Sequence, residues 1–167
     1  PDKIIDLMIE LAYIEHHHTF LEPSAGSGAI CDRIASILST DCLLECFEVN
    51  NTLREILTDK GHNLRGNDFS TFGSMGGVFI KFDRVLMNPP FEKLQDIAHI
   101  QHAFKFLKLG GRLVSIMSPS AFFRSDAKSN AFVKWFYELG GERINLPEGS
   151  FKELGTNKNT IMMVLEK

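Results

Sequence analysis

The segment Asn88-Pro89-Pro90-Phe91 carries the residues best suited to chemistry in this chain of 167 residues. It follows the apolar run Phe82–Met87, which predicts a β-strand. Two successive prolines restrict the backbone and remove two N–H donors, which leaves the carbonyl of Pro89 as an acceptor beside the amide oxygen of Asn88. Two acceptors at this spacing fit the two hydrogens of an exocyclic amine, and Phe91 offers a face on which a planar base can stack.

An aromatic amine is a poor nucleophile because its lone pair is delocalised into the ring. Acceptors that bind both of its hydrogens favour a pyramidal nitrogen, whose lone pair can then point at a methyl donor. Catalysis of this kind rests on positioning and electrostatics, without a metal or a covalent intermediate. The alternative interpretation of the tetrad is a rigid turn that ends a strand, with Phe91 in the core.

A second candidate site is the turn Gly26-Ser27-Gly28, which follows a short apolar run and opens a helical pattern. A dinucleotide-binding turn would need a third small residue where this chain has Cys31, and the carboxylate of Glu22 would repel a pyrophosphate. The turn therefore favours a nucleoside-like ligand that lacks phosphates and carries positive charge, and S-adenosylmethionine fits that description. Without a ligand, the same glycines would simply make a tight strand-to-helix turn.

An acidic residue, Glu48, ends the next apolar run at about 20 residues beyond Gly28, the separation at which an acidic side chain binds a ribose diol. Its two oxygens can accept hydrogen bonds from both hydroxyls. The alternative is that Glu22 and Glu48 are solvated charges at the ends of strands.

Helical and strand patterns alternate along the chain. Helices are predicted over about 2–14, 29–38, 52–60, 97–107 and 132–139, and strands over about 18–21, 42–48, 63–64, 82–87, 112–117, 142–146 and 160–166. The run 67–78 is predicted to be a loop, and Gly110-Gly111 is predicted to end the fourth helix.

Such alternation is typical of a single α/β domain with a largely parallel sheet and helices on both faces. Ligands of these sheets bind beyond the carboxyl ends of the strands. Three chemically unusual segments fall at those ends, namely 22–28, Glu48 and 88–91, and we expect Asn67-Asp68-Phe69 to join them.

Composition limits the classes of function. The chain is 44% hydrophobic and 23% charged, as expected for a globular domain, and no apolar run approaches the ~18 residues of a membrane helix. The start of the chain lacks the features of a signal peptide, and three cysteines without a CxxC pair indicate a reducing, cytoplasmic environment. We expect Cys42 and Cys46 to be buried and His16-His17-His18 to be a polar lead-in to a strand rather than a metal site.

Together these segments resemble the N6-adenine DNA methyltransferases of the Asn-Pro-Pro-Phe/Tyr type, amino-methyltransferases that include phage enzymes and the modification subunits of restriction systems. The likeness covers nearly the whole chain, from the Glu22–Gly28 loop through Asn88–Phe91 to the closing segments Leu146–Phe151 and Thr160–Lys167. It implies a Rossmann-like S-adenosylmethionine-dependent fold, with a mostly parallel seven-stranded sheet that contains one antiparallel strand.

The resemblance also implies roles for individual residues. Cofactor binding is expected of Glu22, Pro23, Ala25, Gly26, Gly28, Glu48, Val49, Asp68 and Phe69. Catalysis is expected of Asn88, Pro89, Pro90 and Phe91, and contact with the substrate base of Phe91 and Phe151. For Phe151, a place in the core of the closing hairpin is an equal alternative.

The expected reaction is methyl transfer to N6 of adenine in nucleic acid, in particular DNA; adenine in RNA, a glutamine amide in a protein, and a non-catalytic binding module remain open. The formal charge of −3 and the pI of about 6.1 require a local basic patch or a partner to hold phosphates. Candidates for a basic rim are Arg124, Lys128, Lys134, Lys152 and Lys158. We expect residues 1–167 to form one catalytic domain without a separate target-recognition domain, so that a recognition subunit or a further domain assists it.

Overall fold

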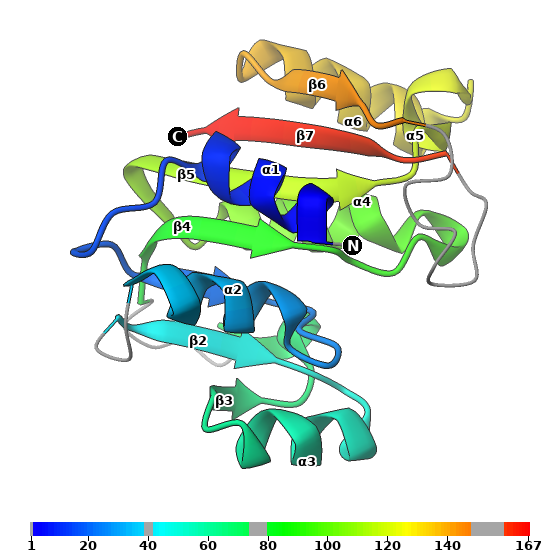
Figure 1. Cartoon of the computed structure of the whole chain (residues 1–167). Helices are drawn as coiled ribbons and strands as arrows, with labels where there is room; N and C mark the ends of the chain where they lie inside the picture. The colour runs from blue at the N-terminus through cyan, green and yellow to red at the C-terminus, as the bar shows by residue number, and fades with distance from the viewer. Residues whose placement is uncertain (1, 39–41, 74–79, 148–158) are drawn as a thin grey trace.

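A computed structural model describes residues 2–38, 42–73, 80–147 and 159–167 (Figure 1). Its centre is a seven-stranded sheet in the order β3-β2-β1-β4-β5-β7-β6. The strands are β1 (Phe20–Glu22), β2 (Leu44–Phe47), β3 (Asn63–Gly66), β4 (Phe82–Met87), β5 (Leu107–Met117), β6 (Glu142–Asn145) and β7 (Ile161–Glu166). Only β7 runs antiparallel to its neighbours β5 and β6 in this sheet. The predicted mostly parallel sheet with one antiparallel strand is therefore confirmed.

Helices cover both faces of the sheet. They are α1 (Asp2–Ala12), α2 (Ala29–Leu38), α3 (Asn51–Asp59), α4 (Gln95–Phe104), α5 (Ser120–Phe123) and α6 (Ala127–Glu138). In Figure 1, α1 and α2 lie in front of the sheet, while α4 and α6 lie behind it. A separate hydrophobic core fills each side, one lined by α1 and α2 and the other by α4 and α6.

The central strands are buried on both faces. Every residue of β1 and β2 is buried, as expected for strands that are covered by helices on two sides. On the front face, Ile4, Met8 and Ala12 share one side of α1 and enter the core. Full burial of a side chain such as that of Met8 contributes roughly 1.5–3 kcal/mol.

Side-chain caps explain where two helices begin. The Asn50 side chain accepts a hydrogen bond from the amide of Leu53 and starts α3. The Asp126 side chain accepts one from the amide of Ser129 and starts α6. Such caps typically stabilise a helix by about 1 kcal/mol. They explain why α3 and α6 begin earlier than the apolar spacing alone predicts.

The predicted end of the fourth helix is wrong. Helix α4 ends at Phe104, and Leu107 already belongs to β5, where it pairs with Phe82. Gly110 lies inside β5 with a φ of 75°, at a register shift, and its amide donates to the carbonyl of Lys167. Apolar residues at positions 104 and 107 fit a helix and a buried strand equally well, so their spacing could not distinguish the two. Three further short helical elements were not predicted: α5 and the 3₁₀ turns η1 (Phe69–Thr71) and η2 (Glu92–Leu94).

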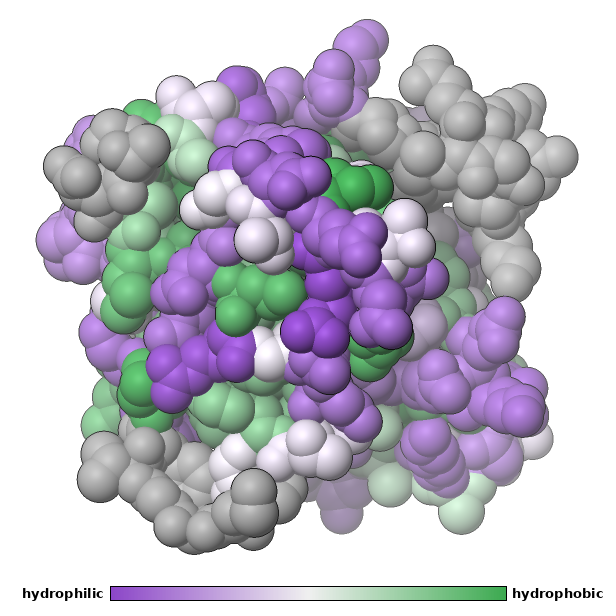
Figure 2. All heavy atoms as spheres, turned by 90° about the horizontal axis from the view of Figure 1, so that it is seen from below, coloured by the Kyte–Doolittle hydropathy of each residue, from purple (hydrophilic) through white to green (hydrophobic). Residues whose placement is uncertain are grey.

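The surface is mixed in polarity. From below the view of Figure 1, hydrophilic side chains alternate with scattered hydrophobic ones (Figure 2). Within the described ranges, no helix has the length and apolar character that crossing a membrane requires.

Candidate active site

One pocket at the carboxyl end of the sheet contains residues from two predicted sites. It has a volume of about 270 Å³ and is lined by Asn88 and by five residues of the Glu22–Gly28 loop, namely Glu22, Ser24, Ala25, Gly26 and Ser27. From the front face, Ile4 and Ile5 of α1 complete its wall. The structure therefore brings the expected cofactor turn and the first residue of the Asn-Pro-Pro-Phe tetrad together.

The glycine turn is held by backbone contacts. The amide of Ala25 donates to the carbonyl of Phe47 at 2.9 Å, and the amide of Gly28 donates to the carbonyl of Ala25 at 2.9 Å. Gly26 and Gly28 have φ angles of 57° and 89°, a region that other residues rarely adopt. A Cβ at position 28 would lie 2.8 Å from the Leu57 side chain, so this glycine also permits close packing of the turn against α3.

Glu48 connects the end of β2 to the glycine turn. One carboxylate oxygen accepts from the amide of Gly26 at 2.8 Å, and the other accepts from the amide of Asn50 at 2.8 Å. Each oxygen retains a further lone pair. The carboxylate is therefore fixed in place and still able to accept two hydrogen bonds, which is the requirement for binding a ribose diol.

Glu22 is almost completely buried at the end of β1, with 1% of its surface exposed. Its carboxyl accepts a hydrogen bond from the Cys31 thiol at 2.9 Å. Burial raises the pKa of Glu22 well above its usual value, because the charged form is poorly solvated there. Cys31, which replaces the third small residue of a dinucleotide turn, thus contributes a donor to the acid of this pocket.

Ser24 is a further candidate site residue that the sequence did not single out. Its hydroxyl oxygen is buried, has no hydrogen-bond partner among the described residues, and belongs to the lining of the pocket. An unpartnered buried hydroxyl in the lining of a pocket is a candidate ligand contact. The signal was available in the loop sequence, but a serine in a glycine turn is too common to single out.

The remaining expected cofactor residues differ in accessibility. Pro23 and Ala25 are buried in the loop, whereas the Val49 side chain is 69% exposed. Asp68 is exposed and caps η1 by accepting from the amide of Ser70 at 2.8 Å, and this hydrogen bond lowers its pKa. In contrast to Val49 and Asp68, Phe69 is buried.

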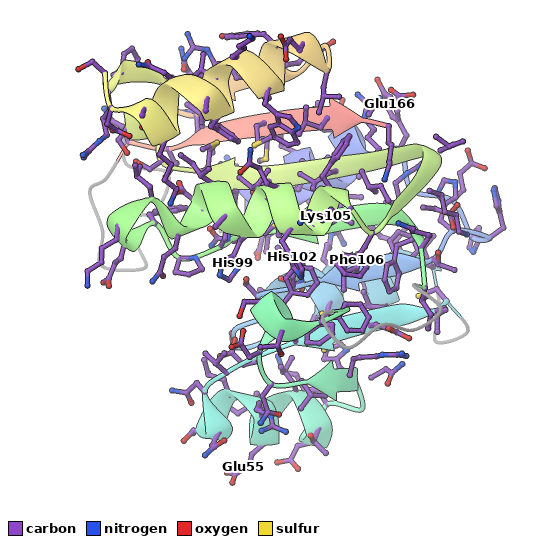
Figure 3. All side chains as sticks on the ribbon, turned by 180° about the vertical axis from the view of Figure 1, so that it is seen from behind. Glu55, His99, His102, Lys105, Phe106 and Glu166 are labelled. Atoms are coloured by element: carbon purple, nitrogen blue, oxygen red, sulfur yellow. The ribbon has the colours of Figure 1, made fainter. Side chains whose placement is uncertain are left out.

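Phe69 lies in an aromatic cluster, with 2% of its surface exposed. Its ring centroid is 5.3 Å from that of Phe47, 4.8 Å from that of His102 and 5.6 Å from that of Phe106. Figure 3 shows His102 and Phe106 projecting from the region of α4 toward this cluster. Packing of Phe69 on a cofactor ring stays a prediction, since the described contacts of the side chain are with other protein rings.

The tetrad follows β4 directly. Asn88 and Pro90 are exposed, Pro89 is buried, and Phe91 is half-buried against the core on the α1 side. Asn88 also belongs to the lining of the pocket, which does not include Pro89, Pro90 or Phe91. The 3₁₀ turn η2 (Glu92–Leu94) continues the chain into α4.

Each of the five residues of the expected basic rim either contacts another protein group or lies outside the described residues. Arg124 forms an ion pair with Asp126 at 2.8 Å, and Lys134 lies 3.8 Å from Glu138. The ammonium of Lys128 donates to the carbonyl of Leu94 at 2.7 Å. Phe151, Lys152 and Lys158 lie outside the described residues.

A further cluster of potential metal ligands lies before β1. Glu15, His17 and His18 have potential ligand atoms within 4.8 Å of one another, but Nδ1 of His18 accepts from the amide of Glu15 at 3.0 Å. That bond places the proton of neutral His18 on Nε2, which leaves neither ring nitrogen ready to bind a metal.

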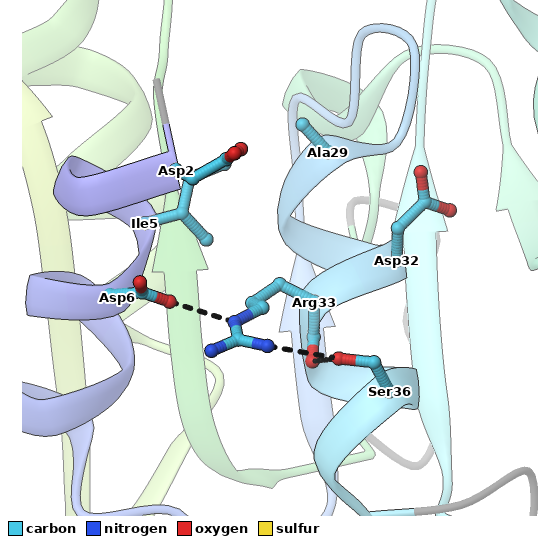
Figure 4. A pocket seen from close by; sticks show the side chains of 7 residues that line it. All are labelled: Asp2, Ile5, Asp6, Ala29, Asp32, Arg33 and Ser36. Carbon is cyan, nitrogen blue, oxygen red and sulfur yellow. Dashed lines mark hydrogen bonds and ion pairs between the residues drawn. The ribbon is translucent and has the colours of Figure 1, made fainter.

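A larger pocket of about 560 Å³ lies between α1 and α2 (Figure 4). Its lining includes Asp2, Asp6, Asp32 and Arg33, and the guanidinium of Arg33 bridges to Asp6 at 2.7 Å. Ile5 of α1 and Ala29 of α2 line this pocket and the smaller one, so the two pockets adjoin each other.

Comparison with solved structures identifies the fold. TrmN from Thermus thermophilus superposes with a TM-score of 0.71 at 20% identity, over 98% of this chain and 48% of TrmN. A class I S-adenosylmethionine-dependent methyltransferase from Listeria monocytogenes gives 0.71 at 15% identity, over 100% of this chain and 60% of that one. An rRNA methylase from Streptococcus thermophilus gives 0.61 at 16% identity, over 99% of this chain and 94% of that one. No protein-family model and no curated protein sequence matches the chain.

The fold is therefore the Rossmann-like fold of S-adenosylmethionine-dependent methyltransferases. The chain spans about half the length of TrmN and 60% of the length of the Listeria protein.

Proposed function

We propose that this chain is an S-adenosylmethionine-dependent methyltransferase that methylates N6 of adenine in nucleic acid, in particular DNA. The observation that carries the proposal is the pocket that contains both the Glu22–Gly28 loop and Asn88. A cofactor site and an amine-binding group need to be adjacent for methyl transfer, because the reacting atoms have to approach within about 3–3.5 Å.

The donor and acceptor set fits the cofactor. Glu22 supplies a carboxyl for an ammonium group, Glu48 retains two acceptors for ribose hydroxyls, and Ser24 has an unpartnered hydroxyl. The glycine turn permits close approach of the backbone at Gly26, where a Cβ would meet no atom within 4 Å. When bound, S-adenosylmethionine supplies an electrophilic methyl group on a sulfonium that leaves as a neutral thioether.

The tetrad would act on the amine. The side-chain oxygen of Asn88 and the carbonyl of Pro89 accept the two N–H hydrogens and hold the nitrogen with its lone pair directed at the methyl group. Neither oxygen is basic enough to keep a proton, so the proton displaced by methylation passes to water. These acceptors stabilise the partial positive charge that develops on the nitrogen in the transition state.

Two observations support a nucleobase as the target. Phe91 follows the acceptor pair directly and offers a ring for stacking on a planar base, and it is only half-buried. The Streptococcus thermophilus structure that shares the fold over nearly its whole length is called an rRNA methylase. Because the net charge of this chain is −3, we also propose that a partner or a further domain helps to hold the nucleic acid.

The test is transfer of a radiolabelled methyl group from S-adenosylmethionine to four acceptors: adenine-containing duplex DNA, the same DNA as a single strand, RNA, and a glutamine peptide. The products are digested and analysed for N6-methyladenine and for N-methylglutamine. The control is Asn88→Ala, which removes one acceptor while leaving the cofactor loop intact. We expect labelled N6-methyladenine in DNA with the wild type and at least about 100-fold less with the variant.

Label in RNA adenine or in glutamine would reassign the substrate and keep the methyltransferase proposal. Equal transfer by Asn88→Ala would remove the role of the tetrad. Failure of the wild type to bind S-adenosylmethionine or to transfer methyl to any acceptor would leave the rival function, a non-catalytic binding module.

A further inference from the structure

Asp96 is a fully buried carboxylate close to the proposed catalytic turn. It lies in the first turn of α4 with 0% of its surface exposed. One oxygen accepts from the amide of Ile97 at 3.0 Å, within the first turn of its own helix. The other accepts from the amide of Ser118 at 3.2 Å, just beyond the end of β5. The second bond joins two segments that are distant in sequence, so a role within its own helix does not by itself account for this residue.

The backbone between the tetrad and Asp96 is strained. Lys93 and Leu94 have φ angles of 52° and 57°, the left-handed region that residues other than glycine rarely occupy. A strained segment persists only where surrounding contacts hold it. At Leu94, the carbonyl accepts a hydrogen bond from the ammonium of Lys128 at 2.7 Å.

Lys128 comes from α6, on the back face of the sheet, so this bond reaches across from another element. Its positive charge also attracts the carboxylate of Asp96, which counteracts the rise in pKa that burial causes in that group. One tie, from Lys128 of α6, is therefore made to Leu94 within the strained pair, and the other, from Asp96 to the end of β5, follows two residues later.

We propose that Asp96 and Lys128 are positioning residues for the turn Asn88–Phe91, which they hold in the shape that its role in methyl transfer requires. The inference rests on the proposed function of that turn. Neither residue lines the pocket that contains Asn88, so both act through the backbone of 92–95. Catalysis by positioning is sensitive to such ties, because a displacement of about 1 Å can reduce the rate about 100-fold.

The principal test is Lys128→Met, which removes the ammonium and keeps the length of the side chain. The matched control is Lys105→Met, which removes one positive charge after the far end of α4, away from the turn. Cofactor affinity, kcat and KM are measured for both. We expect Lys128→Met to lower kcat at least about 10-fold with cofactor affinity within about twofold of wild type, and Lys105→Met to change neither.

A second variant, Asp96→Asn, tests the other tie. An amide has one acceptor oxygen, so it can satisfy Ile97 or Ser118 but not both. We expect the same fall in kcat at unchanged cofactor affinity. A parallel loss of kcat, cofactor affinity and thermal stability in both variants would show a general structural role and overturn the proposal.

Amide hydrogen exchange gives a readout that does not depend on activity. In Lys128→Met, exchange is expected to accelerate in peptides covering 88–96 and to stay unchanged in peptides covering α3; Lys105→Met should resemble wild type in both. If the wild type transfers no methyl group, the proposed function fails while accelerated exchange at 88–96 still supports the ties. Unchanged exchange in the peptides covering 88–96 would overturn the proposal that Asp96 and Lys128 hold the turn, whatever the methyltransferase activity.

Discussion

The carboxylate of Glu48 and the backbone amide of Gly26 are joined by a hydrogen bond of 2.8 Å. This bond links the end of β2 to the glycine turn after β1, and so holds together the two segments that are expected to bind the ribose and the methionine part of the cofactor. A hydrogen bond within the protein that aligns two binding segments reduces the free energy that ordering a site would otherwise cost.

The first prediction concerns Glu48→Gln. Glutamine has one acceptor oxygen, so the variant cannot satisfy the amides of both Gly26 and Asn50 or offer the same acceptors to a ribose. We expect the dissociation constant for S-adenosylmethionine to rise at least about tenfold, equivalent to about 1.4 kcal/mol, as measured by titration calorimetry. The control is Glu55→Gln on the exposed side of α3 (Figure 3), for which affinity should stay within about twofold of wild type. Equal affinities in the two variants would exclude Glu48 from the site.

The second prediction concerns the pH dependence of binding through Glu22. Burial raises its pKa well above the usual value, so the folded chain keeps this proton at pH values where the unfolded chain has lost it. Cofactor affinity should therefore rise with pH as Glu22 ionises, since only the carboxylate pairs with an ammonium group. Glu22→Gln should bind more weakly and lose this rise, as calorimetry over pH 5–9 would show. Titration of the ligand's own amino group is common to both proteins and cancels in the difference.

The same shift has a consequence for stability. A raised carboxyl pKa makes the free energy of unfolding fall as pH rises from the unfolded-state pKa to the folded-state pKa. Glu22→Gln should remove this fall and be relatively more stable than wild type at neutral pH without cofactor. Parallel stability curves for the two proteins across that range would show that Glu22 is ionised when buried.

The third prediction compares two glycines of the same turn. Gly26→Ala forces alanine into a left-handed conformation, at a cost of roughly 1–2 kcal/mol, with no atom within 4 Å of the new Cβ. Gly28→Ala incurs the same strain and also places Cβ 2.8 Å from the Leu57 side chain. We expect urea denaturation to show that the second variant is less stable than the first by about 1 kcal/mol or more. The reverse order would mean that the turn relaxes away from α3.

The fourth prediction concerns acid stability through Asp83. Partial burial by itself would raise its pKa, but hydrogen bonds from the Lys108 ammonium and from Thr19 outweigh that effect and lower the pKa to about 2. A lowered carboxyl pKa contributes stability that is complete above about pH 4 and is lost as pH falls toward 2. In Asp83→Asn, we expect the free energy of unfolding to fall by about 1 kcal/mol less than in wild type between pH 5 and 2, a value that allows for solvent screening. Denaturation curves over this pH range measure the difference. Asp59→Asn, an exposed change on α3, should leave the acid profile as it is in wild type.

Much of the fold followed from local patterns. The alternation of helical and strand periodicity predicted the layers and the sheet, and the expected strands at 82–87 and 112–117 agree with β4 and with most of β5. The error at Gly110 arose because apolar residues at positions 104 and 107 satisfy two periodicities. Leu107 belongs to a strand rather than to the helix because it pairs with Phe82, a residue far away in the chain.

For the candidate site, the residue types in the loops at the strand ends were enough to identify Glu22, Gly26 and Asn88 as candidates, because glycines, prolines and acids at these positions have few other uses. That these three residues line one pocket could be expected from the parallel sheet, whose carboxyl ends meet at one edge. By contrast, the hydrogen bond from Cys31 to Glu22, the burial of Phe69 and the unpartnered hydroxyl of Ser24 depend on how α2, α4 and the turn pack.

The sequence by itself determined the class of fold and the residue types that stand in the strand-end loops, because both follow from short-range patterns. Only the tertiary structure decided which charges are buried and what they bind. No sequence pattern distinguishes Asp96 from a solvated acid near the start of a helix. In the structure, it is fully buried and accepts a hydrogen bond from the amide of Ser118. Burial is a property of elements packed against one another, and no local pattern contains it.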